Sequence, residues 1–505
     1  MQTSTGYLDN YYARLGVPLN ASAEDIRSAY HKAARKLHPD TNSDPTATEL
    51  FLQIQEAYEN LSDPNKRLLY NATLPGDINP PSEIYVNPLY SRSLLPRIDD
   101  TQLVYVLLNM MVSDNYGGEG DEPKVEPASP ALNLCVVVDN STSMAGSRLD
   151  VVKSSITYLL RELNPQDILS IVTFNDRAEV IIPAAKGLDY HSLESRISQL
   201  QTGGGTEMFH GLDTGFREIS KNLSSSYVNQ IILITDGRTY GDEDKCLDLV
   251  KKASKKGVTI SALGIGSEWN DEFVDKLSAL TGGNSTYAEK PKDVLSFFEA
   301  KLERLSTTYA DKVTLELNTG KYSNLRYAFR LSPDPSPLPT DTEINLGYIP
   351  IGPSLSVVLE FAVDKLPPEA EIITLVEGSI KIDIPTRAIP TSISKFSFSR
   401  PVGIDDQVEP PPQALIKAMS RLSLYRLQEQ ARQELANGEV EKATTKLQNL
   451  ATQLLLTGEP ELAHTVMLEL KQVETGSLIS SEAEKRIKYG TRALLLPAGE
   501  NNKSR

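Results

Sequence analysis

The sequence predicts a multidomain α/β protein. We expect an N-terminal helical unit, a doubly wound Rossmann-like α/β domain inserted in or next to a β-sandwich, and a C-terminal helical bundle. The 505 residues are enough for about three domains of roughly 150 residues each. Between residues 131 and 308 apolar, strand-like runs alternate with amphipathic helical segments, whereas between 309 and 408 apolar residues recur at every second position.

Residues 1–74 contain two apolar stripes with helical spacing. The first begins after a capping-box pattern, Ser22 with Asp25, and must end before Pro39, because proline disfavours the helical conformation in the residue that precedes it. The second runs from Phe51 to Leu61. The two stripes predict an antiparallel helical hairpin.

The next segment, residues 75–100, is rich in proline, and we expect a linker there. Residues 101–130 contain an apolar strand, Leu103 to Val112, followed by an acidic loop rich in glycine and proline. We expect this strand to pair with the β-sandwich of residues 309–408, which would make the α/β domain an insertion.

The α/β domain, residues 131–308, has strands that are almost continuously apolar, which is typical of a parallel sheet covered by helices on both faces. These strands are Leu134 to Val138, Ile168 to Phe174, Ile231 to Thr235 and Thr259 to Gly264. Residues 409–476 carry three helical stripes that predict the bundle, with Gly438 and Gly458 as helix ends. We expect a C-terminal tail over residues 477–505.

Composition and charge exclude several classes of protein. The formal net charge of -16 argues against nonspecific nucleic-acid binding, which requires a basic face. Two cysteines, Cys135 and Cys246, cannot form a disulfide framework or a four-cysteine zinc site. No apolar run reaches the roughly 18 residues of a membrane span, and residues 1–10 do not resemble a signal peptide. We therefore expect a cytoplasmic protein without a membrane span.

A set of short motifs occurs in order near the N-terminus. They are Tyr11-Tyr12, Leu15-Gly16, His38-Pro39-Asp40, Glu56-Ala57-Tyr58, Leu61-Ser62-Asp63-Pro64 and Lys66-Arg67. This arrangement resembles the J-domain (DnaJ-like) of Hsp70 co-chaperones over residues 7–71. His31 departs from the family, which usually carries lysine or arginine there, and no Gly/Phe-rich linker or CxxCxGxG repeat follows. These departures indicate a J-protein with specialised partners.

The resemblance implies a DnaK-type Hsp70 as partner. It implies that the loop His38, Pro39 and Asp40 stimulates ATP hydrolysis, and that the first long helix docks on an acidic Hsp70 surface through Arg27, Tyr30, Lys32, Arg35 and Lys36. The alternatives are that Tyr30 is a core residue and that the basic face is simply solvated.

Hydroxyl and carboxylate residues lie in three loops of the predicted α/β domain, two after strands and one, Gly203 to Thr206, that opens a helix. They are Asp139, Ser141 and Ser143, then Thr206 after three glycines, and Asp236 after the strand Ile231 to Thr235. Ligand sites in doubly wound sheets lie at the carboxyl ends of the strands. An all-oxygen set favours Mg²⁺ or another hard divalent cation such as Mn²⁺ or Ca²⁺, and does not suit zinc. The alternative is that these residues only cap helices.

The three loops resemble the von Willebrand factor A (VWA) domain with a complete metal-ion-dependent adhesion site. The resemblance implies that Ser141, Ser143 and Thr206 ligate the ion directly, that Asp139 and Asp236 act largely through water, and that an acidic residue of a protein partner completes the coordination.

Together these motifs predict a non-enzymatic adaptor, because the sequence offers no nucleophile with an associated base. We expect it to recruit Hsp70 through the J-domain and to bind a protein client through the metal site. Two alternatives remain. The chain could be a VWA assembly subunit of an AAA+ ATPase-type complex, or a Mg²⁺-dependent phosphohydrolase, which the small number of carboxylates disfavours.

Overall fold

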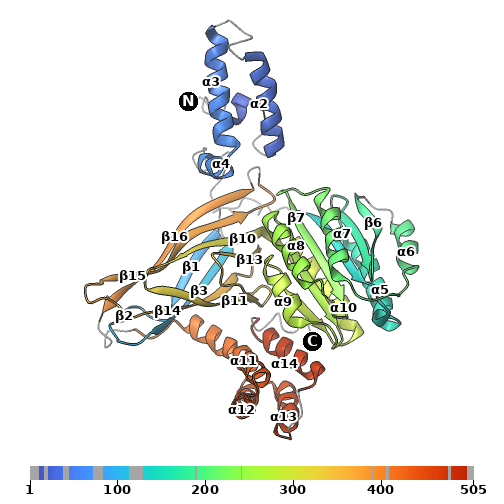
Figure 1. The fold of residues 1–505 in the computed structure, drawn as a ribbon, viewed down its shortest axis with the longest axis vertical. Helices are drawn as coiled ribbons and strands as arrows, with labels where there is room; N and C mark the ends of the chain where they lie inside the picture. Colours follow the sequence, from blue (N-terminus) through green and yellow to red (C-terminus); the bar gives the residue numbers. More distant parts are fainter. Residues whose placement is uncertain are drawn as a thin grey trace, which may run out of the picture.

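The computed structural model describes residues 11–15, 17, 21–37, 45–71, 84–112, 129–187, 190–239, 241–387, 390–403, 409–475 and 479–496. Figure 1 shows the sandwich and the α/β domain side by side, with the N-terminal helices at one end of the molecule and the C-terminal helices at the other. The predicted fold class is confirmed in its main features.

The N-terminal unit is a helical hairpin with two short flanking helices. Its elements are α1 (Tyr11–Leu15), α2 (Ala23–Leu37), α3 (Pro45–Leu61) and α4 (Pro64–Asn71). The predicted start of α2 is confirmed: the Asp25 amide donates to Ser22 Oγ at 3.1 Å, and the Ser22 amide donates to Asp25 Oδ2 at 2.9 Å. Buried Tyr12, Ile26 and Ala57 form the core between the helices.

The α/β domain is doubly wound around a six-stranded sheet in the order β6-β5-β4-β7-β8-β9. All its pairings are parallel except that of β6 with β5. The strands are β4 (Ala131–Asp139), β5 (Ile168–Phe174), β6 (Ala178–Lys186), β7 (Tyr227–Thr235), β8 (Thr259–Ile265) and β9 (Ser285–Ala288). The helices are α5 (Ser147–Glu162), α6 (Tyr190–Ser198), α7 (Met208–Ser220), α8 (Glu243–Lys255), α9 (Asp271–Ala279) and α10 (Pro291–Ser306).

Successive residues of β4 belong to opposite cores, which explains its uninterrupted apolar sequence. Val136 and Val138 pack in the cluster that includes α5, α6 and α10, whereas Cys135 and Val137 pack in the cluster that includes α7, α8 and α9. Both faces of the sheet are therefore covered, as the sequence predicts.

The β-sandwich surrounds the α/β domain in the sequence. Its sheets have the strand orders β1-β3-β14-β11-β12 and β13-β10-β15-β16-β2. The strands after the α/β domain are β10 (Thr308–Thr319), β11 (Ser323–Ser332), β12 (Ser336–Leu338), β13 (Glu343–Pro350), β14 (Leu355–Val363), β15 (Ile372–Asp383) and β16 (Thr391–Gly403). β3 (Gln102–Val112) pairs antiparallel with β14, so the predicted insertion is confirmed.

The prediction of a linker over residues 75–100 is wrong in its second half. β1 (Ile84–Tyr90) pairs with β3 along its whole length, and β2 (Leu95–Pro96) pairs with β16. β1 is the edge strand of its sheet. A proline such as Pro88, which has no N–H to donate, is tolerated there because one side of an edge strand forms no hydrogen bonds with a neighbouring strand. Prolines that look like linker residues therefore occur here in an edge strand.

The C-terminal domain consists of α11 (Gln413–Ala436), α12 (Val440–Leu456), α13 (Pro460–Glu474) and α14 (Ser481–Ala493). Gly438 and Gly458, with φ of 78° and 84°, follow the ends of α11 and α12 as predicted. The prediction of a tail over residues 477–505 is wrong for Ser481–Ala493, which form the helix α14. This helix has few apolar residues, because much of its buried face consists of Lys485, Lys488 and Arg492.

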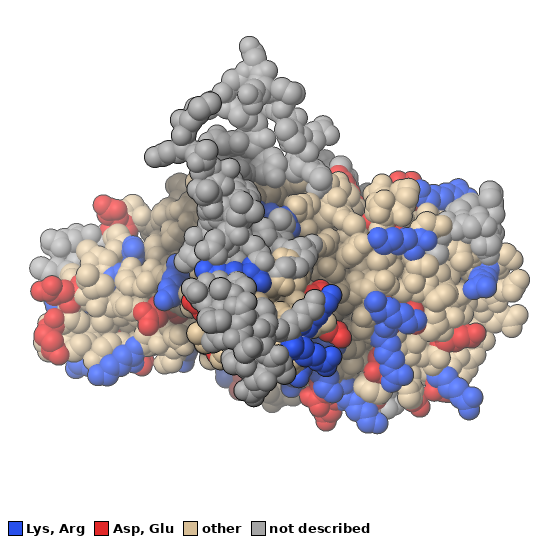
Figure 2. All heavy atoms as spheres, turned by 90° about the horizontal axis from the view of Figure 1, so that it is seen from above, with Lys and Arg blue, Asp and Glu red and all other residues tan. Residues whose placement is uncertain are grey.

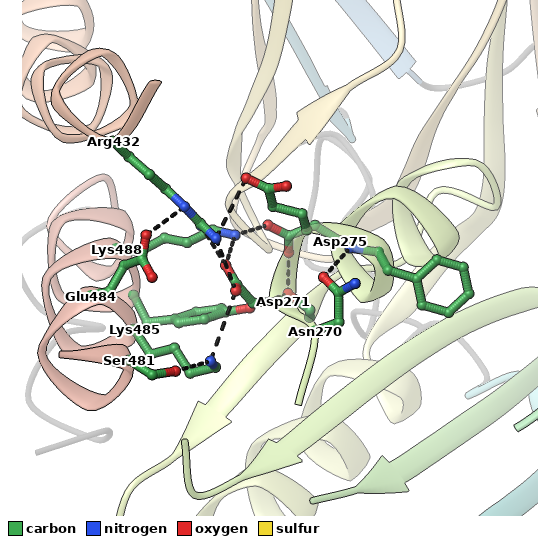
Figure 3. Close-up of polar contacts among 12 residues, drawn as sticks. Asn270, Asp271, Asp275, Arg432, Ser481, Glu484, Lys485 and Lys488 are labelled. Atoms are coloured by element: carbon green, nitrogen blue, oxygen red, sulfur yellow. Dashed lines mark hydrogen bonds and ion pairs between the residues drawn. The ribbon is translucent and has the colours of Figure 1, made fainter. Parts of the chain in front are cut away.

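A cluster of buried ion pairs joins α14 to α9 of the α/β domain (Figure 3). Lys488 bridges Asp271 and Asp275, Arg492 Nη2 lies 2.7 Å from Asp275 Oδ2, and Arg432 of α11 lies 2.8 Å from Asp271 Oδ2. Burial by itself would raise the pKa of Asp271, but Lys488 and Arg432 lower it to about 2. The two carboxylates are therefore charged and compensated.

We predict that Asp275→Asn lowers the free energy of unfolding by about 3–5 kcal/mol, because it leaves Lys488 and Arg492 in a buried site with one carboxylate fewer. Trp269, the chain's single tryptophan, is buried and lies near Tyr489 of α14, with ring centroids 5.9 Å apart, so its fluorescence reports this interface during urea unfolding. The control is Lys251→Gln, which removes an ion pair between exposed side chains and should change stability by less than about 1 kcal/mol. Equal urea midpoints for the two variants would contradict the prediction.

Candidate metal centre

The candidate site lies where β4 and β7 end. β4 ends at Asp139 and β7 ends at Thr235, one residue before Asp236. The two strands are parallel neighbours, so their carboxyl ends meet at one edge of the sheet. Both carboxylates are completely buried, with 0% exposure. A buried charge of this kind requires compensation by hydrogen bonds, a cation or both.

Hydrogen bonds to both oxygens fix the orientation of Asp139. The Ser141 amide donates to Oδ1 at 2.9 Å, and the Thr235 hydroxyl donates to Oδ2 at 2.7 Å. Burial raises the pKa of this carboxyl, the hydrogen bonds from Ser141 and Thr235 oppose that shift, and the nearby charge of Asp236 adds to it. A bound cation would stabilise the charged form of Asp139 in this buried site, and it would also offset the repulsion between Asp139 and Asp236.

Two serine hydroxyls lie in front of the carboxylates. Ser141 Oγ and Ser143 Oγ are 3.0 Å apart, and Ser143 Oγ donates to Asp236 Oδ1 at 2.6 Å. Because that donation uses the proton of Ser143, Ser141 is the donor in the contact between the two hydroxyls, and one lone pair of Ser143 Oγ remains available to a cation. A pair of hydroxyl oxygens at this separation is compatible with two neighbouring ligands of a hard divalent cation.

The glycine loop before Thr206 is bound to the loop that contains the serines. The Gly203 amide donates to the Asn140 carbonyl at 2.9 Å, and the Thr142 hydroxyl donates to the Gly204 carbonyl at 3.0 Å. On the other side, a Cβ added at Gly237 would lie 3.1 Å from Thr206 Oγ1, so the threonine hydroxyl lies beside the Asp236 loop. The structure thus brings all three predicted loops together.

The donor set consists of two carboxylates and three hydroxyls. Within the described ranges, no group of three or more His, Cys, Asp or Glu side chains could hold a metal ion. A site at this edge would therefore depend on the hydroxyls as well as on Asp139 and Asp236. These five residues fit a hard cation by the chemistry of their oxygens, and their binding of a metal stays a prediction.

The predicted set omits two residues that contact the carboxylates. Thr235 binds Asp139, and Arg148 of α5 forms an ion pair with Asp236. Arg148 also donates to the Ser143 carbonyl at 3.3 Å. The sequence signal for Arg148 is a single cation five residues after Ser143, in the first turn of the helix that follows the motif; only the fold shows which carboxylate it faces.

The predicted Hsp70-binding residues are described in part. Arg27, Lys32 and Arg35 are exposed on α2, as docking requires. Tyr30 is half-buried and stacks on Tyr58, with ring centroids 4.1 Å apart, so it packs with the core. The loop His38, Pro39 and Asp40 and the side chain of Lys36 lie outside the described residues.

On the face shown in Figure 2, the charge of the described residues is mixed: Lys and Arg side chains are scattered, and Asp and Glu side chains lie among them.

Family models assign three parts of the chain. The DnaJ domain model matches residues 10–71, the von Willebrand factor type A domain model matches residues 133–303, and the model of the Sll0103-like C-terminal alpha-helical domain matches residues 413–497. The chain therefore contains a J-domain, a VWA domain and a C-terminal helical domain. The DnaJ domain implies a partner of the DnaK/Hsp70 class.

Individual relatives match different parts. "Uncharacterized protein sll0103" of Synechocystis is 27% identical over 376 residues, which cover 72% of this chain and 89% of that protein. "Uncharacterized protein YfbK" of Escherichia coli is 28% identical over 193 residues, or 37% of this chain and 34% of YfbK. "Chaperone protein DnaJ 2" of Thermus thermophilus is 55% identical over 62 residues, which cover 12% of this chain and 22% of that protein. The similarity to DnaJ 2 is thus confined to the J-domain.

Solved structures share the fold of the larger part. "von Willebrand factor type A from Catenulispora acidiphila" aligns with a TM-score of 0.61 and 14% identity, covering 81% of this chain and 96% of that one. The ArnB paralog VWA2 from Sulfolobus acidocaldarius aligns with a TM-score of 0.52 and 16% identity, covering 82% and 100%. At these identities the likeness shows the fold alone. Among the described helices, none combines the length and apolar character needed to cross a membrane.

Proposed function

We propose that the protein is a non-enzymatic adaptor co-chaperone. Its J-domain recruits and stimulates a DnaK-type Hsp70, and its VWA domain binds a client protein through a Mg²⁺-dependent contact with an acidic residue of the client. The observation that carries this proposal is the convergence of Asp139, Ser141, Ser143, Thr206 and Asp236 at one sheet edge, in a chain that also contains a J-domain.

The residues of the site have separable tasks. Ser141, Ser143 and Thr206 present hydroxyl oxygens, and the buried Asp139 and Asp236 provide negative charge. A bound Mg²⁺ would supply an open coordination position for a carboxylate, because the two acidic residues cannot provide all the ligands of a six-coordinate ion. The serines and the threonine would keep that position at the edge of the sheet, within reach of another protein.

Joining the two binding activities in one chain has a simple physical consequence. A client held by the VWA domain is tethered to the J-domain, which raises the effective concentration of Hsp70 activation near that client. A contact of modest affinity is then sufficient for delivery. The exposed basic residues Arg27, Lys32 and Arg35 favour encounter with an acidic Hsp70 surface, although the whole chain is acidic.

We predict that Asp40→Asn abolishes the stimulation of a DnaK-type Hsp70 in single-turnover ATP hydrolysis, because it removes the carboxylate of the His38-Pro39-Asp40 loop. The matched control is Glu59→Gln, an equally small loss of charge on the exposed surface of α3. This control should stimulate ATP hydrolysis as the parent does. Full stimulation by Asp40→Asn would show that the loop is dispensable.

We predict that millimolar Mg²⁺ raises the melting temperature of the parent, because a ligand that binds only the folded protein stabilises it, by about 2.7 kcal/mol at 100 times its Kd. Ser141→Ala should lose this rise, since it removes one candidate ligand. The control Ser154→Ala removes an exposed hydroxyl of α5 that donates to the Asp150 carbonyl, and it should keep the rise. Scanning fluorimetry with Mg²⁺ and with EDTA measures the difference. The same rise in all three proteins would assign the effect to another site.

We predict that Mg²⁺ controls which proteins crosslink to the chain. The parent should capture a defined set of clients in Mg²⁺ and release it in EDTA, whereas Asp139→Ala should not capture that set in either condition. Capture of Hsp70 should be equal in both proteins, because it depends on the J-domain, and it serves as the internal control. Identical client sets with and without Mg²⁺ would reject the metal-dependent contact.

A further inference from the structure

Arg148 is a cation built into the candidate metal site. Its guanidinium pairs with Asp236 Oδ2 and donates to the Ser143 carbonyl at 3.3 Å. Arg148 is 37% exposed at its side chain, whereas the side chain of Asp236 is fully buried. Arg148 therefore joins a partly exposed side chain to a fully buried carboxylate of the site.

Gly266, directly after β8, makes room for this guanidinium. It has φ of +70°, and a Cβ at this position would lie 3.0 Å from Arg148 Nη2. The Trp269 indole donates to the Gly266 carbonyl at 2.9 Å and fixes the turn. A larger residue at 266 would be strained and would press against Arg148. The position of Arg148 is thus supported by the surrounding fold.

The charges of the three residues that meet at this edge do not cancel with a divalent ion alone. Asp139 and Asp236 together with Arg148 carry one net negative charge. A divalent cation would change this to one net positive charge, and a single carboxylate from another protein would cancel it. Asp176, which accepts from the Gly205 amide at 2.8 Å, is exposed, so solvent screens its charge. Repulsion between Arg148 and a divalent ion acts at short range next to buried carboxylates, where charge interactions are only weakly screened.

We propose that Arg148 weakens the binding of the metal ion alone and thereby makes the ion and the carboxylate of the partner bind together. This inference rests on the proposed function, because it requires the site to bind Mg²⁺. Asp236 is completely buried, and Ser143 donates to its Oδ1, so its orientation does not depend on Arg148 alone. The main effect of Arg148 on the ion is therefore repulsion.

Isothermal titration of Mg²⁺ alone into the parent, Arg148→Gln and Arg148→Lys tests the proposal. Arg148→Gln removes the charge and keeps a hydrogen-bond donor, and it should bind Mg²⁺ at least about tenfold more tightly, a change that corresponds to about 1.4 kcal/mol. Arg148→Lys keeps the charge and should bind close to the parental Kd. Unchanged or weaker binding by Arg148→Gln would overturn the proposal, because that result is expected if Arg148 only orients Asp236.

A second measurement uses acetate as the probe for the carboxylate of the partner. Acetate should tighten Mg²⁺ binding in the parent, relative to chloride at equal ionic strength, and should tighten it several-fold less in Arg148→Gln. Equal gains in both proteins would overturn the linkage. Trp269 fluorescence verifies that each variant is folded.

The outcomes separate the two proposals. If the parent binds Mg²⁺ and Arg148→Gln does not bind it more tightly, only the proposed role of Arg148 is rejected. Absence of binding in the parent and in both variants removes the metal-dependent function itself, and the inference with it.

Discussion

The compensated charge of Asp271 and Asp275 on α9 is the interaction on which the arrangement of the domains depends. Lys488 and Arg432 reach these carboxylates from the C-terminal helices (Figure 3). Arg492 of α14 also pairs with Asp275. Separating the domains would break these ion pairs, and a buried charge without a partner raises the free energy of the protein. The ion pairs therefore fix one particular orientation of α14 on the α/β domain. Apolar packing alone would define this orientation less precisely, because it is not directional.

The β-sandwich holds the same part of the α/β domain from another direction. Arg330 of β11 is 1% exposed and donates to the carbonyls of Gly282 and Gly283, which follow α9, at 2.6 and 2.7 Å. The segment from α9 to β9 is therefore fixed by the sandwich and by the helical domain. The loop before α9 continues this arrangement toward the metal edge: Lys485 donates to the Ser267 carbonyl at 2.7 Å, and Arg238, two residues after Asp236, donates to the Glu268 carbonyl at 3.0 Å.

The sequence predicted well those features that depend on short-range patterns. The strands of the α/β domain were identifiable because apolar residues fill both faces. Four of the candidate ligands were identifiable because they lie at the ends of those strands or in the loop just after, and Thr206 because it follows three glycines before a helix. α14 was not identifiable, since hydrophobic periodicity does not show that Lys485, Lys488 and Arg492 are buried by pairing with carboxylates more than 200 residues earlier. β1 and Arg148 depended in the same way on neighbours that only the folded chain provides.

Two groups of buried carboxylates in this protein differ in their balance of charge. At α9, Asp271 and Asp275 pair with Lys485, Lys488, Arg492 and Arg432, and Arg432 also pairs with Glu272 and Glu484. The charges of this cluster are therefore matched, and it has a structural role. At the edge formed by β4 and β7, the two carboxylates of Asp139 and Asp236 are accompanied by a single ion pair, from Arg148 to Asp236. The other polar groups in contact with them on the serine loop are the Ser141 amide and the Ser143 hydroxyl, which are neutral. The residual negative charge there favours an added cation. The same side-chain chemistry thus produces a domain contact where the charges are matched and a candidate ligand site where carboxylates are in excess.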